Sequence, residues 1–241
     1  NGMADFVGTA RGFLADPHFA EKVLTGMPYN RCQGCNKCIE AVLKGKPVLC
    51  AYNPEVGHEA EEKTHRKVVS AKKVLVVGAG PAGLEAAKKS AERGYKTILC
   101  TEESALGGML VEAAIPPHKQ DLLKFIENKK YELEHLGVDI RYNTSVDGEF
   151  VKELKPYFVV EAFGGDAVVP NIKGIDRENV HMALDVLKGD SKLIADIKKG
   201  STVIIGGGTV GLETAQYIAA KHYAVEESKS FNKMFIGSDI P

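Results

Sequence analysis

A glycine-rich turn between an apolar segment and a helical pattern constrains the fold of this chain most strongly. Residues 72–77 (KKVLVV) form a nearly continuous apolar run, which predicts a strand buried on both faces. The turn GAGPAG at 78–83 follows, then a helical pattern that ends at Gly94 and a second apolar strand at 95–100. This order predicts a βαβ unit whose first turn binds the pyrophosphate of a dinucleotide.

The residues of this turn have distinct roles in the predicted nucleotide site. The first glycine makes the turn, the second lets the backbone approach the pyrophosphate, and the third lets helix and strand pack closely. The helix N-terminus offers N–H groups and its positive dipole end to the phosphates. The predicted contacts are Gly78, Gly80, Pro81, Ala82 and Gly83.

The end of the second strand departs from the usual pattern. An acidic residue normally stands there and binds the ribose hydroxyls. In this chain Thr101 occupies that position and Glu102 follows. Either Glu102 binds the ribose hydroxyls from a position one residue further along the chain, or the contact with the ribose is weakened. Cys100, the last residue of the strand, is expected to be a small buried residue.

The same pattern occurs a second time at 206–211 (GGGTVG), between the apolar segment 201–205 and another helical pattern. The predicted contacts to a second nucleotide are Gly206, Gly208 and Gly211. A strand that ends in an acid does not clearly follow. Glu226 is the nearest candidate, with a surface charge as the alternative, and the loop itself has the alternative of a packing turn without a ligand.

Four cysteines form the second constraint. Cys32, Cys35 and Cys38 have the spacing C-x2-C-x2-C, and Cys50 follows. Thiolates are the usual ligands of iron–sulfur clusters, and two-residue gaps let a turn direct successive sulfurs inward. Tetrahedral zinc is the main alternative, but zinc sites usually join two separated C-x2-C pairs. The spacing therefore favours a four-iron cluster over zinc and over unligated cysteines.

Composition excludes several classes of protein. The net charge of −1 and the absence of Trp indicate no nucleic-acid surface, and no apolar run approaches the roughly 20 residues that span a bilayer. Five cysteines fit a disulfide framework poorly, which favours a reducing cytoplasm. No side chain is needed as an acid or a nucleophile, so no catalytic residue is predicted.

Further elements follow from local pattern. A strand is predicted at 4–10, then a helix that opens at Asp16 with Pro17 and ends at Gly26. A long helix is predicted at 119–136, and strands at VDIRY and YFVVEA. The fold class is therefore α/β, with a cysteine-rich segment before a doubly wound dinucleotide-binding fold.

Together these segments resemble the iron–sulfur flavoenzymes related to 2,4-dienoyl-CoA reductase and trimethylamine dehydrogenase, a branch of the old yellow enzyme group. Residues 4–26 resemble the last strand and helix of that family's flavin-binding (β/α)8 barrel, and RCQGCNKC with Cys50 resembles its cluster segment. VLVVGAGPAGLEAA and ALGG resemble its FAD domain. Residues 168–189 with VIIGGGTVGLETA resemble the crossing into its NAD(P)H domain.

The resemblance implies cofactors and site residues. The cofactors are a 4Fe-4S cluster, FAD, NAD(P)H and, where the barrel is present, FMN. The resemblance makes Arg11 a neighbour of the barrel flavin's phosphate, and makes Gly107 and Gly108 contacts of FAD. The three glycines of the second loop become nicotinamide-nucleotide contacts. The implied cluster ligands are Cys32, Cys35, Cys38 and Cys50.

The chain also departs from that family. Nearly all of the barrel is absent, and Phe163 stands where a small hydroxyl residue is expected. The second nucleotide domain is short, and the tail MFIGSDIP resembles a return to the FAD site with Asp239 near the ribityl chain. The chain is therefore either a naturally short protein or the visible part of a longer one.

The expected organisation and function follow. The predicted segments are the barrel end at 1–31, the cluster segment at 32–54, a linker at 55–71, the FAD domain at 72–168 and a partial NAD(P) domain at 169–241. The predicted function is an enoate-reductase-like oxidoreductase that passes electrons between NAD(P)H, FAD and the cluster, toward an FMN site outside the sequence. The expected partner is an electron acceptor or the barrel, as a domain or as a subunit of an oligomer. Alternatives are an electron-transfer subunit without a working nicotinamide site, and a structural nucleotide-binding remnant.

Overall fold

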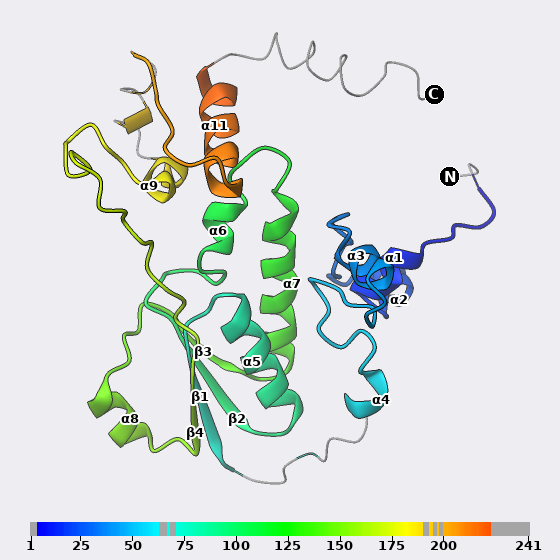
Figure 1. Cartoon of the computed structure of the whole chain (residues 1–241). Helices are drawn as coiled ribbons and strands as arrows, with labels where there is room; N and C mark the ends of the chain where they lie inside the picture. Colours follow the sequence, from blue (N-terminus) through cyan, green and yellow to red (C-terminus); the bar gives the residue numbers. More distant parts are fainter. Residues whose placement is uncertain are drawn as a thin grey trace. The chain divides into compact units, whose positions relative to one another are not determined.

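The computed structural model divides the chain into two compact units (Figure 1). The first comprises Asn1–Leu110 and Asp121–Gly165, and the second comprises Val111–Gln120 and Asp166–Pro241. The residues that the structure describes are 4–62, 67, 71–189, 193–194, 197 and 200–222. Among these, no helix is both long and apolar enough to cross a membrane.

A four-stranded parallel sheet forms the centre of the first unit (Figure 1). Its strands are β1 (Lys73–Val77), β2 (Lys96–Cys100), β3 (Asp139–Arg141) and β4 (Phe158–Glu161), in the order β3-β2-β1-β4. All three strand pairs are parallel. Strand β1 is central because its apolar run buries both faces, as the sequence predicts.

Helices cover both faces of this sheet. On one face α5 (Pro81–Glu92) and α7 (Asp121–His135) pack over Val76 and Leu99. On the other face α8 (Gly148–Leu154) packs over Leu75. A short helix, α6 (Leu110–Ala113), precedes α7. The predicted βαβ unit and the predicted long helix are therefore confirmed.

The residues before the sheet form short helices, one of them the predicted helix that ends at Gly26, and the predicted strand is not among them. These helices are α1 (Ala10–Ala15), α2 (Phe19–Thr25), α3 (Lys37–Leu43) and α4 (Glu59–Glu62). The strand predicted at 4–10 is wrong: Phe6 and Val7 are exposed, and no strand among the described residues pairs with them. The predicted end of α2 at Gly26 is confirmed by its left-handed backbone, with φ +70°.

Asp16 does not cap α2 as predicted. The helix begins at Phe19 after His18, and the Asp16 carboxylate accepts the His18 backbone N–H at 3.0 Å and the Lys22 ammonium at 2.8 Å. The carboxylate is 3% exposed, so it forms a buried ion pair instead of a helix cap. The residue predicted as the N-cap thus forms a buried link between α2 and the segment that follows it.

The second unit contains α9 (Ala183–Lys188) and α11 (Thr209–His222). Val186 and Leu187 of α9 pack with Tyr217 of α11. The helix predicted after the second glycine turn is confirmed, but the strand predicted at 201–205 is not formed. Val203 and Ile205 are exposed, because the described residues supply no neighbouring strand to hold this segment extended.

Helix α8 offers a local test of the fold. The Asp147 carboxylate accepts the Phe150 backbone N–H at 2.8 Å, which caps the helix N-terminus. Asp147→Ala is therefore expected to lower the free energy of unfolding by about 1 kcal/mol, measured by urea denaturation. Asp147→Asn keeps the acceptor and should stay close to wild type. Equal losses in both variants would contradict the capping role.

Candidate cofactor sites

The first glycine turn packs so closely that side chains are excluded at two positions. Gly78 has φ +102°, and a Cβ there would lie 2.3 Å from the Ala162 carbonyl oxygen. A Cβ at Gly83 would lie 1.8 Å from the Gly78 carbonyl oxygen. The turn therefore needs glycine at its first position for its left-handed backbone and its approach to the residues after β4, and at its third position for packing of helix α5 on the turn.

The middle glycine has a different environment. Gly80 precedes α5 with φ −72°, and a Cβ there would meet nothing within 4 Å. Open space thus lies at the N-terminus of α5, where Pro81 and Ala82 form the first turn of the helix. A helix N-terminus with open space and no side chain is the geometry that accepts a pyrophosphate.

A second pair of glycines lies against this turn. The Gly107 N–H donates to the Ala79 carbonyl oxygen at 2.9 Å. Gly108 has φ +51°, and a Cβ there would lie 3.1 Å from the Gly80 Cα. The structure therefore brings the ALGG segment to the first glycine turn, although 23 residues lie between Gly83 and Gly107 in the sequence.

Thr101 and Glu102, the two residues after β2, have different environments. Thr101 is buried, and its hydroxyl accepts the Glu103 backbone N–H at 3.2 Å. Glu102 is exposed, and its carboxylate accepts the Ser145 hydroxyl at 2.7 Å. Thr101 is thus used inside a turn, whereas Glu102 places a carboxylate at the same end of the sheet as the glycine turn.

The second glycine turn repeats the backbone geometry of the first. Gly206 has φ +113°, and a Cβ at Gly211 would lie 2.0 Å from the Gly206 carbonyl oxygen. A Cβ at Gly208 would meet nothing within 4 Å, as at the middle glycine of the first turn. The predicted acid Glu226 and the tail residue Asp239 lie outside the described residues.

The four predicted cluster ligands line one cavity. Residues 32–50, here called the cysteine loop, contribute all four cysteines, and the empty space of the cavity is about 320 Å³ when the open solvent at its mouth is included. Positive φ angles at Gly34 (+65°) and Asn36 (+58°) curl the backbone between the cysteines. Arg11 lies at the same cavity, and its guanidinium donates to the Asn36 side-chain oxygen at 2.9 Å.

The arrangement of these thiols is compatible with a cluster. Among the described residues, no three His, Cys, Asp or Glu side chains are placed to hold one metal ion. Each thiolate of a four-iron cluster binds a different iron, so its ligands need to surround a cavity and do not converge on one point. The Tyr52 backbone N–H lies 3.4 Å from the Cys50 sulfur and donates to it.

Cys100 differs from the other four cysteines. It is fully buried in the sheet, next to Leu75 and Ile98. Burial raises the pKa of its thiol, although Arg141 opposes this shift. A buried neutral thiol is neither a ligand nor a nucleophile, so the prediction that Cys100 is a structural residue is confirmed.

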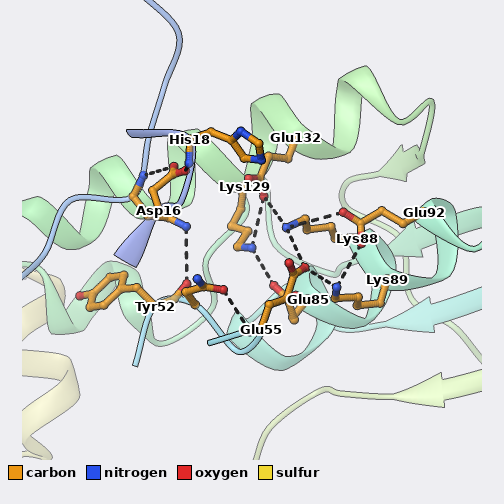
Figure 2. A network of polar contacts seen from close by, with 12 residues as sticks. Asp16, His18, Tyr52, Glu55, Glu85, Lys88, Lys89, Glu92, Lys129 and Glu132 are labelled. Atoms are coloured by element: carbon orange, nitrogen blue, oxygen red, sulfur yellow. Dashed lines mark hydrogen bonds and ion pairs between the residues drawn. The ribbon is translucent and has the colours of Figure 1, made fainter. Parts of the chain in front are cut away.

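Buried ion pairs join the segment that carries the cysteine loop to α5 and α7 (Figure 2). Lys129 of α7 is almost completely buried, and its ammonium lies 2.6 Å from a Glu85 oxygen and 3.2 Å from a Glu132 oxygen. Glu132 also lies 3.9 Å from Lys22, the partner of Asp16. These charges form one chain of contacts from α2 to α5.

A second set of pairs continues from Glu55, which follows the cysteine loop (Figure 2). Glu55 pairs with Lys89 of α5 and lies 3.9 Å from Lys88. Burial opposes the charge on Lys88, but four carboxylates together outweigh it and raise its pKa: Glu132, Glu92, Glu85 and Glu55. The predicted linker at 55–71 therefore begins with residues that contact α5.

Sequence reasoning missed these interface residues. Lys129 carries one detectable signal, because it stands three residues after Ile126 and four before Leu133, on the buried face of the helical pattern. A lysine at such a position predicts a buried partner. Asn30, which precedes Cys32, and Asn128 of α7 also meet here through a hydrogen bond, and they carry no comparable signal, since asparagine is common both in loops and at helix surfaces.

A parallel sheet with a glycine-rich turn at the N-terminus of its first helix defines a dinucleotide-binding fold. Residues 72–230 match the pyridine nucleotide-disulphide oxidoreductase family, and the chain belongs to that family. At this level, the expected α/β fold that binds FAD and NAD(P) is supported, and the match agrees with the expected class of NAD(P)H-dependent flavin oxidoreductases.

Individual relatives extend the match in front of the nucleotide-binding fold. An NADH oxidase of Thermoanaerobacter brockii is 39% identical over 226 residues, which cover 91% of this chain and 34% of that protein. A metal reductase of Desulforamulus reducens is 40% identical over 225 residues, which cover 90% of this chain and 33% of that protein. A solved structure of a 2-naphthoyl-CoA reductase complex has a TM-score of 0.79 at 30% identity. The match covers 90% of this chain and 33% of that chain. The chain therefore spans about a third of the length of these relatives.

Proposed function

We propose that this chain is the electron-carrying part of an iron–sulfur flavoenzyme of the 2,4-dienoyl-CoA reductase and trimethylamine dehydrogenase type. One observation carries the proposal: four cysteines line one cavity in the same compact unit as the first glycine turn. A dinucleotide fold beside a four-thiol cavity pairs a two-electron carrier with a one-electron carrier.

The first glycine turn is the proposed FAD site. Gly78 and Gly83 shape the turn, and Gly80 leaves room for the pyrophosphate at the start of α5. Gly108 lies against Gly80, which supports its proposed contact with the flavin nucleotide. Glu102 is the proposed partner of the ribose hydroxyls, because its carboxylate is exposed at the correct end of β2.

The cysteine loop is the proposed 4Fe-4S site. Its four cysteines line one cavity, and the N–H of Tyr52 is directed at the Cys50 sulfur. A hydrogen bond to a ligand sulfur is one of the features that set the reduction potential of a cluster. When bound, FAD accepts a hydride and its two electrons from NAD(P)H, and the cluster carries such electrons singly. Free thiols fit a reducing compartment, so a cytoplasmic location belongs to the proposal.

Arg11 is the proposed contact with FMN where the barrel is present. A second cavity beside the cysteine loop is lined by Arg11, Arg31 and Thr9. Two guanidinium groups and a hydroxyl form a donor set that suits a phosphate. The barrel would be supplied by the part of the protein that this chain does not cover, either as a domain or as a subunit.

The second glycine turn is the proposed NAD(P)H site, and here a competing function has support. Gly206, Gly208 and Gly211 have the backbone geometry of the first turn, but the segment 201–205 is not a strand. An electron-transfer subunit without a working nicotinamide site is therefore the second candidate.

Anaerobic titration with NADH and with NADPH separates the two candidates. A reductase is expected to lose its flavin absorbance on addition of one of the two nucleotides. Dithionite, which reduces flavin without a nicotinamide site, is the matched control. Bleaching by dithionite but by neither nucleotide would contradict the reductase and leave the electron-transfer subunit.

A further inference from the structure

The two ends of the cysteine loop meet at one buried amide. Asn30 is 7% exposed and precedes Cys32 by two residues, and Tyr52 follows Cys50 by two. The Asn30 side-chain amide donates a long hydrogen bond, 3.5 Å, to the Tyr52 carbonyl oxygen. The Asn30 backbone N–H donates to the Asp16 carboxylate at 3.0 Å. These contacts close the base of the cysteine loop and tie it to the turn before α2.

The same amide contacts α7. The Asn128 side-chain nitrogen donates to the Asn30 side-chain oxygen at 2.7 Å, and Asn128 is fully buried. The Asn128 side-chain oxygen has no hydrogen-bond partner in the described part of the chain, so the buried amide depends on Asn30. The Tyr52 ring meets the Phe125 ring of α7 edge-on, with centroids 5.1 Å apart.

We propose that Asn30 and Asn128 are positioning residues that hold the cysteine loop in one register on α7. The inference rests on the proposed function, in which the cysteine loop holds a cluster that exchanges electrons with a flavin on the adjoining fold. Both residues act through the loop, and neither is assigned a contact with a cofactor.

The physical reason lies in the directionality of the bond. Two ion pairs, Lys22–Glu132 and Arg31–Asp121, each 3.9 Å long, join this segment to α7, and they tolerate small displacements because Coulomb attraction falls slowly with distance. The hydrogen bond between the Asn30 and Asn128 amides, 2.7 Å long, does not tolerate such displacements, because a shift of the loop leaves two buried polar groups unpaired. The ion pairs therefore hold the loop near α7, and the Asn30–Asn128 bond sets its position.

A displaced loop would also change the surroundings of the thiols. Tyr52 lines the cysteine cavity, donates its N–H to the Cys50 sulfur and accepts the bond from Asn30 at its carbonyl oxygen. Movement of Tyr52 therefore alters the hydrogen bond to Cys50. Since such bonds tune a cluster, its midpoint potential reports on the position of the loop independently of turnover.

The test uses Asn30→Ala, Asn128→Ala and the double variant in the purified protein. The control is Glu127→Gln, a change at an exposed residue of the same helix. With iron and FAD contents unchanged, amide hydrogen exchange across residues 30–54 should become faster and the cluster potential should shift. Reduction of the cluster after NADH addition should become measurably slower, because electron transfer slows as the distance between flavin and cluster grows. The double variant should be no slower than the slower single variant.

Other outcomes separate failure of the positioning role from failure of the proposed electron-transfer function. Unchanged exchange and potential in variants that keep their iron would overturn the positioning role and leave the proposed function intact. A wild-type protein without iron would overturn both. If the alanine variants do not fold, Asn30→Asp keeps an acceptor for Asn128, removes the donor to Tyr52 and adds a negative charge at the same position. Wild-type exchange and potential in that variant would overturn the loop-closing role of Asn30.

Discussion

A Cys35→Ala variant is expected to lose most of its iron and sulfide while it keeps its FAD. The four cysteines line one cavity, and a four-iron cluster uses one thiolate per iron. Removing one ligand leaves an iron open to solvent, so the cluster should not survive purification. FAD should remain, because its proposed contacts lie at the first glycine turn and not in the cysteine loop. Iron and acid-labile sulfide assays with the absorbance spectrum measure the effect.

Cys100→Ala is the matched control for this variant. Cys100 is buried in the sheet beside Leu75 and lines neither cavity described for the cysteine loop. The control should keep wild-type iron. Full iron in Cys35→Ala, or loss of iron in Cys100→Ala, would contradict the assignment of the cluster to the cysteine loop. Zinc in place of iron in the wild type would select the zinc alternative.

The second large effect is expected at the first glycine turn, where one alanine substitution should lower the stability of the protein and another should lower its affinity for FAD. A Cβ at Gly83 would lie 1.8 Å from a backbone oxygen of Gly78, so strand and helix must separate. Gly83→Ala should destabilise the apoprotein by about 3 kcal/mol, the upper part of the usual range for overpacking. That loss should outweigh the gain of about 1 kcal/mol that alanine offers in a helix.

Gly80→Ala should leave the apoprotein as stable as the wild type. A Cβ there meets nothing within 4 Å, and φ −72° suits alanine. FAD affinity should nevertheless fall at least about tenfold, or about 1.4 kcal/mol, because the methyl group occupies the space proposed for the pyrophosphate. Urea denaturation of the apoprotein and FAD titration separate the two variants. Unchanged FAD affinity in Gly80→Ala would place the nucleotide elsewhere.

The parts of the fold that were predicted correctly are specified by local sequence. Strand β1, the turn at Gly78 and helix α5 follow one another within 20 residues, and each has its own periodicity or breaker. The C-terminal Gly26 of α2 is similarly local, because its left-handed backbone ends the helix wherever the helix packs. Such elements need little tertiary information.

The parts that were missed depend on partners distant in the sequence. Asn30 and Asn128 are 98 residues apart, and neither has a pattern that predicts the other. Asp16 has the sequence context of a helix cap, but its buried contacts with Lys22 and Asn30 exist only after the segments pack together. The strand predicted at 201–205 fails for the same reason, since an apolar segment becomes a strand only beside another strand.

Anaerobic absorbance, with iron and sulfide analysis before and after addition of NAD(P)H, tests the central claim most directly. The account predicts flavin and a broad cluster absorbance, about four irons and four sulfides per chain, and bleaching of both chromophores by the nucleotide. A protein that carries neither iron nor flavin would contradict the account. It would leave only a nucleotide-binding fold with a cysteine-lined cavity.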